Sequence, residues 1–313
     1  MNSEEKSKEE IQAERKAKKE AQKAAKLAAK QKSTAESKAA EKPSTVSTAK
    51  SDANSSPVTT AEPEIVIPGL EDLKVQLQSS AGDDACLHLA NYLFENSAEF
   101  SVETIFQQLG SAAEDHFGCR QFRNLCQPGV SAEQLRKWIP DFVKNRIDLA
   151  SDSISELVLQ KLQTVQAVAV FSWSPLLKRI LTKAVNEPSL AKLRVVVIDT
   201  PPGQLGKTLV RNLVDGNNNV NVSYSSLAAF SSCIGQCQLV LLSVDGAFPG
   251  QVATAHGGSA VSLIAEYFGV PCVGVAASFR VSEKPPPKLH NGDLFPSKLL
   301  TELLTEDLTV VKS

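Results

Sequence analysis

The residues most suggestive of chemistry lie in a turn at positions 199–208, which reads Asp-Thr-Pro-Pro-Gly-Gln-Leu-Gly-Lys-Thr. Its Gly-Lys-Thr ending is typical of a P-loop, in which consecutive backbone N–H groups surround a phosphate. The P-loop pattern requires glycine at the position of Pro201, however, and neither Pro201 nor Pro202 has an N–H to donate. We therefore expect Gly206 to allow close backbone packing and Lys207 to be an exposed cation. A P-loop NTPase remains an alternative, in which Lys207→Ala would abolish nucleotide binding.

A second candidate is the long loop that follows the apolar run at residues 239–243. It leaves the carboxyl end of a predicted strand, where open α/β sheets place their ligand crevice. Asp245 in this loop could be a catalytic carboxylate or a structural turn residue. Ser259 could cap a helix that begins near Ala260, which would leave free N–H groups suited to an anion, or the segment could be an ordinary capped helix.

Cysteine and histidine spacing gives no sign of a metal site. The six cysteines and the histidines show no ligand-like pairing, and neither His88 nor His116 has a partner at ligand spacing. Buried thiols in a reducing, cytosolic environment account for the cysteines. We therefore expect neither a metal nor another cofactor.

Five apolar, β-branched runs recur through residues 166–279 and would position these candidates. The runs are continuous rather than alternating, which favours strands covered on both faces: residues 167–171, 194–199, 220–224, 239–243 and 271–278. Helical spacing separates them at residues 175–184, 205–214 and 261–268. Strands that alternate with helices form right-handed βαβ units, so the sequence predicts an α/β fold with a doubly wound, Rossmann-like parallel sheet.

The segments before this sheet differ from it in composition. Residues 1–62 are rich in Lys, Ala and Glu and then in Ser and Thr, and we expect a disordered tail or a solvated helix. Residues 63–150 read as a helical domain and residues 151–313 as the α/β domain. Expected helices lie at residues 70–77, 83–94, 102–116, 131–147 and 147–162, with Asp83 and Ser131 as N-caps and Gln134 completing a capping box.

Charge and hydropathy limit the function classes. The formal net charge is −2, which is too small for a nucleic-acid-binding body. The basic stretch at residues 15–32 could contact RNA or could be a solvated tail. No apolar run is long enough to span a membrane and the N-terminus has no secretory core, so we expect a cytoplasmic protein.

The part of the chain after residue 147 resembles a known family. That family comprises the alpha, beta and delta subunits of the eukaryotic exchange factor for translation initiation factor 2, and the delta type is the most similar. It is related to isomerases of phosphorylated ribose. The similar motifs are the strand and turn at 195–207, the loop and helix start at 245–260, the strand at 269–273 and the segment at 292–299. Relative to the delta type, the stretch between Phe279 and Asp293 is short.

The resemblance implies a sugar-phosphate pocket that has lost its chemistry. In the isomerases a cysteine and an aspartate act on the sugar, and an arginine and a glutamine hold its phosphate. Here Ser172 replaces the cysteine, Pro201 the arginine and Leu205 the glutamine, whereas Asp245 matches. We expect these residues to form a vestigial pocket together with the helix start at Gly258 and Ser259. A lone carboxylate without its partners cannot run proton transfer between sugar carbons efficiently.

What the resemblance implies is therefore a regulatory or assembly subunit rather than an enzyme. Its expected partners are the other subunits of the exchange factor and the alpha subunit of initiation factor 2, with no membrane and no sequence-specific nucleic acid. The alternative is a relative of the ribose-phosphate isomerases with a degenerate pocket.

Overall fold

The computed structural model describes residues 67–80, 82–126, 129–201, 204–216, 221–284 and 292–307. Residues 65–313 form one compact unit. The expected tail at residues 1–62, including its basic stretch, lies outside the described residues.

The segment before the sheet is helical, as predicted. Its helices are α2 (Leu70–Ser79), α3 (Asp83–Asn96), α4 (Val102–Leu109), α5 (Ser111–Glu114), α6 (Phe117–Leu125) and α7 (Ala132–Phe142). The expected helix over 102–116 is broken at Gly110, whose φ is 53°, a value that favours glycine. Helix α6 was not expected. The capping box of Ser131 and Gln134 is present.

The predicted cap at Asp83 is wrong. Gly82 is the N-cap of α3, and Asp83 is the first helical residue. Its carboxylate bonds to Arg280, far along the chain, instead of to the N–H groups of its own helix. The carboxylate oxygens of Asp83 could accept either from the N–H groups of its own helix or from Arg280. Only the first possibility can be inferred from the local sequence.

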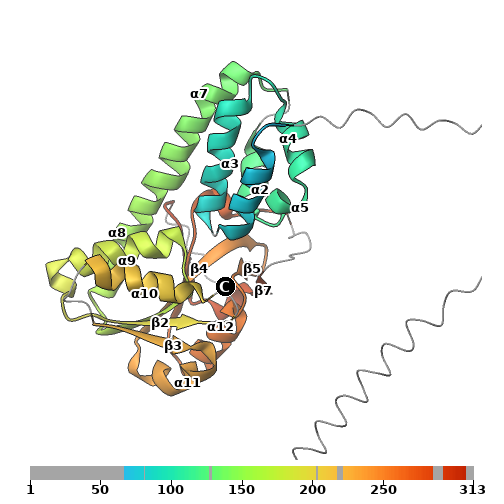
Figure 1. Cartoon of the computed structure of the whole chain (residues 1–313). Helices are drawn as coiled ribbons and strands as arrows, with labels where there is room; N and C mark the ends of the chain where they lie inside the picture. The colour runs from blue at the N-terminus through green and yellow to red at the C-terminus, as the bar shows by residue number, and fades with distance from the viewer. Residues whose placement is uncertain are drawn as a thin grey trace, which may run out of the picture. The chain divides into compact units, whose positions relative to one another are not determined.

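Helix α7 continues without a break into the sheet segment. It passes through a π-helical stretch, η1 (Val143–Leu149), into α8 (Ala150–Leu162), so the proposed division at residue 150 separates two segments of one compact unit. Asp152 on α8 bonds to Arg179 at 2.7 Å and to Lys183 at 2.6 Å, both on α9 (Pro175–Asn186). The long helix therefore connects the helical segment to the sheet (Figure 1).

The predicted parallel sheet is present, with strand order β3-β2-β1-β4-β6-β8. Its strands are β1 (Ala167–Phe171), β2 (Arg194–Asp199), β3 (Asn221–Ser226), β4 (Leu239–Phe248), β6 (Cys272–Val275) and β8 (Glu302–Leu304). Helices α9 and α10 (Leu205–Gly216) cover one face, and α11 (Phe230–Cys233) and α12 (Gly258–Tyr267) cover the other (Figure 1).

Alternate residues of the central strands enter different cores, which explains their continuous apolar runs, whereas the expectation of burial on both faces is wrong for β3, whose residues are exposed or half-buried. In β1, Val168 and Val170 pack in the core shared with the helical segment, whereas Ala169 and Phe171 pack against the α11 and α12 side. All five residues of β1 are buried. The doubly wound α/β fold is confirmed.

The loop expected after residue 243 is partly a β-hairpin. Strand β4 runs on to Phe248, turns at Pro249-Gly250 and pairs antiparallel with β5 (Gln251–Thr254), which in turn pairs with β7 (Asp293–Pro296). Gly250 has a φ of 73°, which suits the turn. The sequence did carry a signal, because a Pro-Gly pair separates two short apolar stretches.

Candidate functional site

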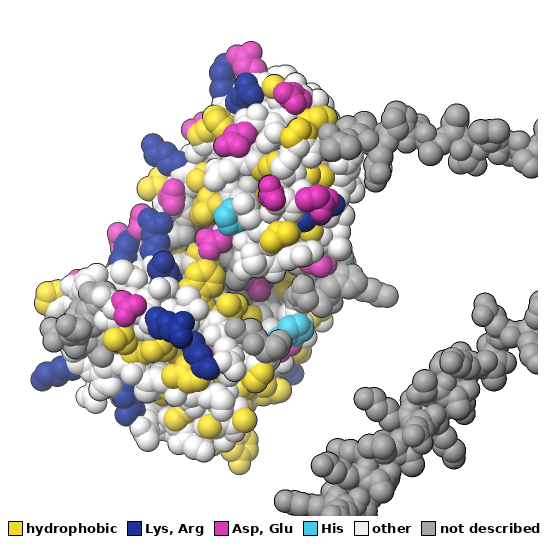
Figure 2. All heavy atoms as spheres, in the orientation of Figure 1, with side chains coloured by type: hydrophobic (Ala, Val, Ile, Leu, Met, Phe, Trp, Pro, Cys, Tyr) yellow, Lys and Arg dark blue, Asp and Glu magenta, His cyan; other side chains and the backbone are white. Residues whose placement is uncertain are grey.

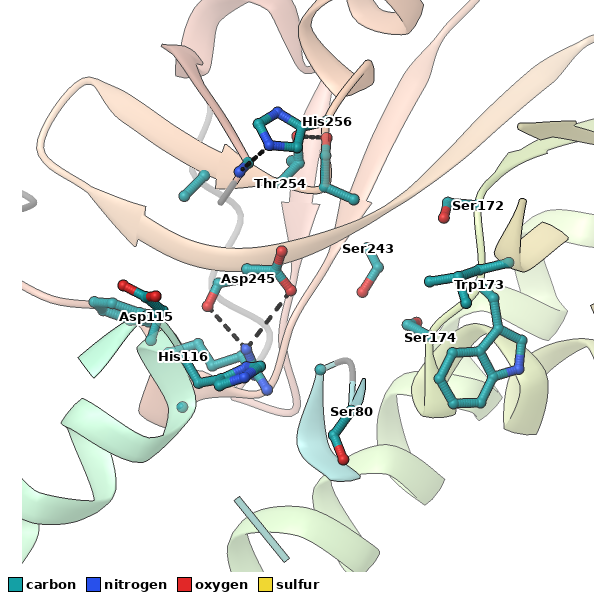
Figure 3. A pocket seen from close by; sticks show the side chains of 18 of the residues that line it. Ser80, Asp115, His116, Ser172, Trp173, Ser174, Ser243, Asp245, Thr254 and His256 are labelled. Atoms are coloured by element: carbon teal, nitrogen blue, oxygen red, sulfur yellow. Dashed lines mark hydrogen bonds and ion pairs between the residues drawn. The ribbon is translucent and has the colours of Figure 1, made fainter. Parts of the chain in front are cut away.

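A cavity of about 430 Å³ opens between the helical segment and the sheet, at the carboxyl end of β1 and at Ser243, where the parallel pairing of β4 ends (Figure 3). This is the position at which parallel α/β sheets bind ligands. Its labelled polar side chains come from both parts: Ser80, Asp115 and His116 from the helical segment, and Ser172, Ser174, Ser243, Asp245, Thr254 and His256 from the sheet segment.

The structure brings together only part of the pocket predicted from sequence. Ser172, Leu205 and Asp245 line the cavity. Pro201 is exposed and does not line it. Gly258 and Ser259 also lie outside the lining, although their neighbouring segment at Thr254–His256 contributes to it.

Ser172 has a left-handed backbone. Its φ is 61°, and its N–H donates to the carbonyl of Ile198 at 2.7 Å. The left-handed region disfavours residues with a Cβ, so such a position stores strain and is frequently found at binding sites. The strained residue follows β1 directly and faces the cavity (Figure 3).

Arg280 is the main residue that sequence reasoning missed. It is 4% exposed, and its Nε donates to Asp83 at 3.0 Å while its Nη1 donates to the Asp245 carbonyl at 2.9 Å. It lies in η5 (Ser278–Arg280), just after β6. A charged residue in the short segment after a buried parallel strand was the available signal, but its partner Asp83 is far away in sequence.

Asp245 lies on the cavity wall, with 38% of its side chain exposed and Oδ1 at 3.9 Å from Arg280 Nη1. Loss of hydration raises the pKa of the Asp245 carboxyl above its usual range; Arg280 opposes this, and the carboxylate of Asp83 adds to it. Asp245 is therefore a carboxylate at the cavity wall whose nearest cation, Arg280, is shared with Asp83.

His116 is a neutral hydrogen-bonding group. Its Nε2 lies 2.7 Å from the carbonyl oxygen of Leu77, and because a carbonyl can only accept, Nε2 carries the proton. Burial lowers the pKa of His116, the bond to Leu77 opposes that effect, and the nearby charge of Arg280 lowers the pKa further. The neutral ring retains Nδ1 as an acceptor.

Asp293, and not Ser259, caps helix α12. One carboxylate oxygen, Oδ2, accepts from the N–H of Gly257 at 2.9 Å, from the N–H of Ser259 at 3.2 Å and from the Ser259 hydroxyl at 2.6 Å. The predicted Ser259 cap is therefore wrong. Burial alone would raise the pKa of Asp293, but these bonds and a weaker one from His256 lower it overall.

The turn after β2 is closed by a carboxylate of its own. Asp199 accepts from the N–H of Thr200 and from the N–H of Gly206, each at 2.8 Å. A Cβ on Gly206 would lie 3.0 Å from Asp199, which confirms the close packing expected there. Lys207 is exposed, as predicted, and bonds to Gln204. The N–H groups that a P-loop would offer to phosphate are thus partly occupied.

Two further expectations concern absences. Among the described residues there is no cluster of His, Cys, Asp or Glu that could hold a metal ion. None of the described helices is long and apolar enough to cross a membrane.

On the face in Figure 2, basic and acidic side chains of the described residues are interspersed.

Comparison with known proteins gives a family. The model of the Initiation factor 2 subunit family matches residues 4–289. A curated relative, translation initiation factor eIF2B subunit delta from Schizosaccharomyces pombe, is 23% identical over 153 residues. That match covers 49% of this chain and 32% of the relative's length.

Solved structures share the fold. The translation initiation factor eIF-2B of Pyrococcus horikoshii OT3 has a TM-score of 0.67 at 13% identity and covers 79% of this chain and 98% of its own. eIF2B delta from Chaetomium thermophilum has a TM-score of 0.65 at 16% identity, and the match covers 77% of this chain and 97% of that one. A chain of the tetrameric eIF2B-beta2-delta2 complex from the same organism has a TM-score of 0.56 at 20% identity, and the match covers 76% of this chain and 88% of that one.

Proposed function

Because the chain belongs to the Initiation factor 2 subunit family, we propose that it is a delta-like regulatory or assembly subunit of the guanine-nucleotide exchange factor that acts on translation initiation factor 2. Its proposed partners are the other exchange-factor subunits and the alpha subunit of initiation factor 2, in the cytosol. Support comes from the relative named as subunit delta and from the similar fold in a beta–delta complex.

The cavity supports a role without turnover. Among the described lining residues, Ser172 stands where the resemblance to the isomerases places a catalytic cysteine, so Asp245 lacks that partner. The nearest guanidinium, Arg280, is already bonded to Asp83 and to a backbone carbonyl. Proton transfer on a sugar needs a matched acid and base within reach of the same substrate. This observation carries the proposal that the subunit is not an enzyme.

Association with beta-type subunits is the first test. The tagged full chain would be co-expressed with an exchange-factor beta subunit and analysed by affinity purification and size-exclusion chromatography with light scattering. We expect a stable complex in fixed stoichiometry. Elution of two separate proteins at micromolar concentration would contradict the proposal.

An isomerase relative is the second candidate, because Asp245, which matches the aspartate of the isomerases, lines the cavity. It predicts turnover of a ribose phosphate by the purified chain, reduced by about 10²–10⁴ in Asp245→Asn as expected for loss of a general acid or base. The subunit proposal predicts no turnover in either protein. Asp148→Asn, which removes an exposed carboxylate that does not line the cavity, is the matched control.

A further inference from the structure

Strand β3 is a free edge of the sheet. Among the described strands it pairs only with β2, so alternate residues direct their N–H and C=O groups away from the sheet without a strand to receive them. Proteins commonly protect such edges with charged side chains, with proline or by keeping the strand very short. The other two end strands follow this rule, because β8 has three residues and β7 carries Pro296.

Strand β3 has none of these protections. It is six residues long, its sequence Asn-Val-Ser-Tyr-Ser-Ser contains neither charge nor proline, and its pairing with β2 is regular along its whole length. Each of its residues is exposed or half-buried. An uncharged, regular strand with one free side is a template for the addition of another strand.

Helix α10 presents an apolar flank beside this edge. Lys207 Nζ lies 5.8 Å from the centroid of the Tyr224 ring on β3, so the side of α10 that carries Lys207 faces β3. Val210 and Val214 follow on the same side of the helix. Val214 is 44% exposed and Tyr224 is 40% exposed. Apolar surface of both elements is therefore left uncovered at the edge.

The spacing of these elements suits a second copy of the chain. Helix α10 packs on both β2 and β3 and so lies over the space between them. Two β3 strands paired antiparallel, about 4.8 Å apart, would place the two α10 helices about 10 Å apart on the same face of the joined sheet. Packed helices usually lie about 8–10 Å apart, so the helices would meet without a gap.

The charges on α10 favour this arrangement. Lys207 and Arg211 lie in the first two turns of the helix and Asp215 lies near its end, and all three are exposed. A two-fold axis perpendicular to the sheet makes the two α10 helices antiparallel. The basic part of each helix then lies beside the acidic end of the other, so the contact is electrostatically complementary to itself.

We infer that the free edge of β3 is a dimerisation surface, at which a second copy of this chain adds its own β3 in antiparallel orientation. Residues directly opposite each other lie on the same face of a sheet, so the two-fold axis passes through a residue. With the axis at Ser223, Val222 lies opposite Tyr224 of the partner subunit, an aliphatic–aromatic pair of the kind that stabilises sheets. The inference concerns the chain alone and does not depend on the proposed exchange-factor role.

Charge substitutions at Ser223 test the dimer. Sedimentation velocity of the full-length chain between about 1 and about 100 µM should show a monomer–dimer equilibrium, as expected for a small interface. Ser223→Lys and Ser223→Glu each place like charges opposite each other at the axis and should weaken dimerisation at least about tenfold. An equimolar mixture of the two variants should dimerise again, because opposite charges then meet. Misfolded variants would not regain association on mixing.

A control and a second partner make the outcome specific. Asn212→Lys adds a charge on the opposite side of α10 from Val214 and should leave the dimer intact. A wild-type chain that stays monomeric at about 100 µM, or variants that dimerise as wild type does, would overturn the inference. Loss of an exchange-factor beta subunit from Ser223→Lys, with wild type monomeric on its own, would also overturn it and assign the edge to that subunit. Failure of wild type to bind the beta subunit while it still dimerises would count against the exchange-factor role alone.

Discussion

Asp83 and Arg280 are 197 positions apart in the sequence and form a buried ion pair that joins the first turn of α3 to the segment after β6. Their side chains are 7% and 5% exposed. The same guanidinium donates to the Asp245 carbonyl, so one arginine fixes the helical segment, the end of the sheet and the cavity wall together.

Removing one member of this pair should be strongly destabilising. Arg280→Met leaves the Asp83 carboxylate buried without its counterion, and we expect the free energy of unfolding to fall by about 3–5 kcal/mol. Urea denaturation at pH 7 measures the loss. The control Glu133→Gln removes an exposed (i, i+4) pair with Lys137 and should cost about 0.5 kcal/mol or less. Similar losses in the two variants would show that the buried pair has no special role.

The tight approach at Gly258 should not tolerate a side chain. A Cβ there would overlap the hydroxyl of Thr254, which is itself 1% exposed and cannot move freely. We expect Gly258→Ala to lower the free energy of unfolding by about 1–3 kcal/mol and Gly258→Val to lower it more. Thermal and urea unfolding measure both. Gly235, whose added Cβ meets nothing within 4 Å, is the matched control, and Gly235→Ala should not destabilise by a comparable amount.

The strands were predictable because their signal is local. Buried parallel strands show continuous β-branched runs, and β1 and β2 have the bounds expected from sequence. Strand β8 was missed because only a short segment, Glu302–Leu304, pairs with β6. The break at Gly110 depends on backbone dihedrals that glycine permits but does not dictate.

The site was less predictable because it is made by partners distant in sequence. Asp245 could be placed at the end of a strand, but the approach of Arg280 and Asp83 depends on how the helical segment packs. Likewise, Asp293 replaces Ser259 as the cap of α12 only because β7 pairs with β5. The local sequence shows that a residue such as Ser259 is able to cap a helix. It does not show whether a residue distant in sequence, such as Asp293, lies closer to the same N–H groups.

Capping of α12 by Asp293 should make stability depend on acidic pH. The folded-state pKa of Asp293 is lowered, so its contribution is fully present above the unfolded value of about 3.9 and is lost as pH falls through the lower folded value. We expect Asp293→Ala to cost about 1–2 kcal/mol at pH 7, as for other lost caps. Urea unfolding at pH 7 and pH 3 should show a smaller cost at pH 3. A cost independent of pH would contradict the ionised cap.

His116 should make the stability of the protein depend on pH near neutrality. Its folded-state pKa is lowered by burial, so the folded protein binds fewer protons than the unfolded chain, and stability falls as pH drops below about 6.5. Arg280, Asp115 and Arg120 are the charged groups that influence it. In His116→Gln the free energy of unfolding should change less between pH 7.5 and pH 5.5 than in wild type. An unchanged pH slope would show that another group titrates.

The turn after β2 should not bind nucleotide, because Asp199 occupies the N–H of Gly206 and Pro201 has no N–H to donate. Asp199 bonds to the N–H of Gly206 at the start of α10 and to the Tyr224 hydroxyl at 3.3 Å, so Asp199→Ala should lower the free energy of unfolding by about 1–2 kcal/mol. Lys207→Ala removes an exposed cation and should leave stability nearly unchanged. Calorimetric titration with Mg·ATP should detect no binding in wild type or in either variant. ATP binding by wild type that Lys207→Ala abolishes would restore the P-loop interpretation.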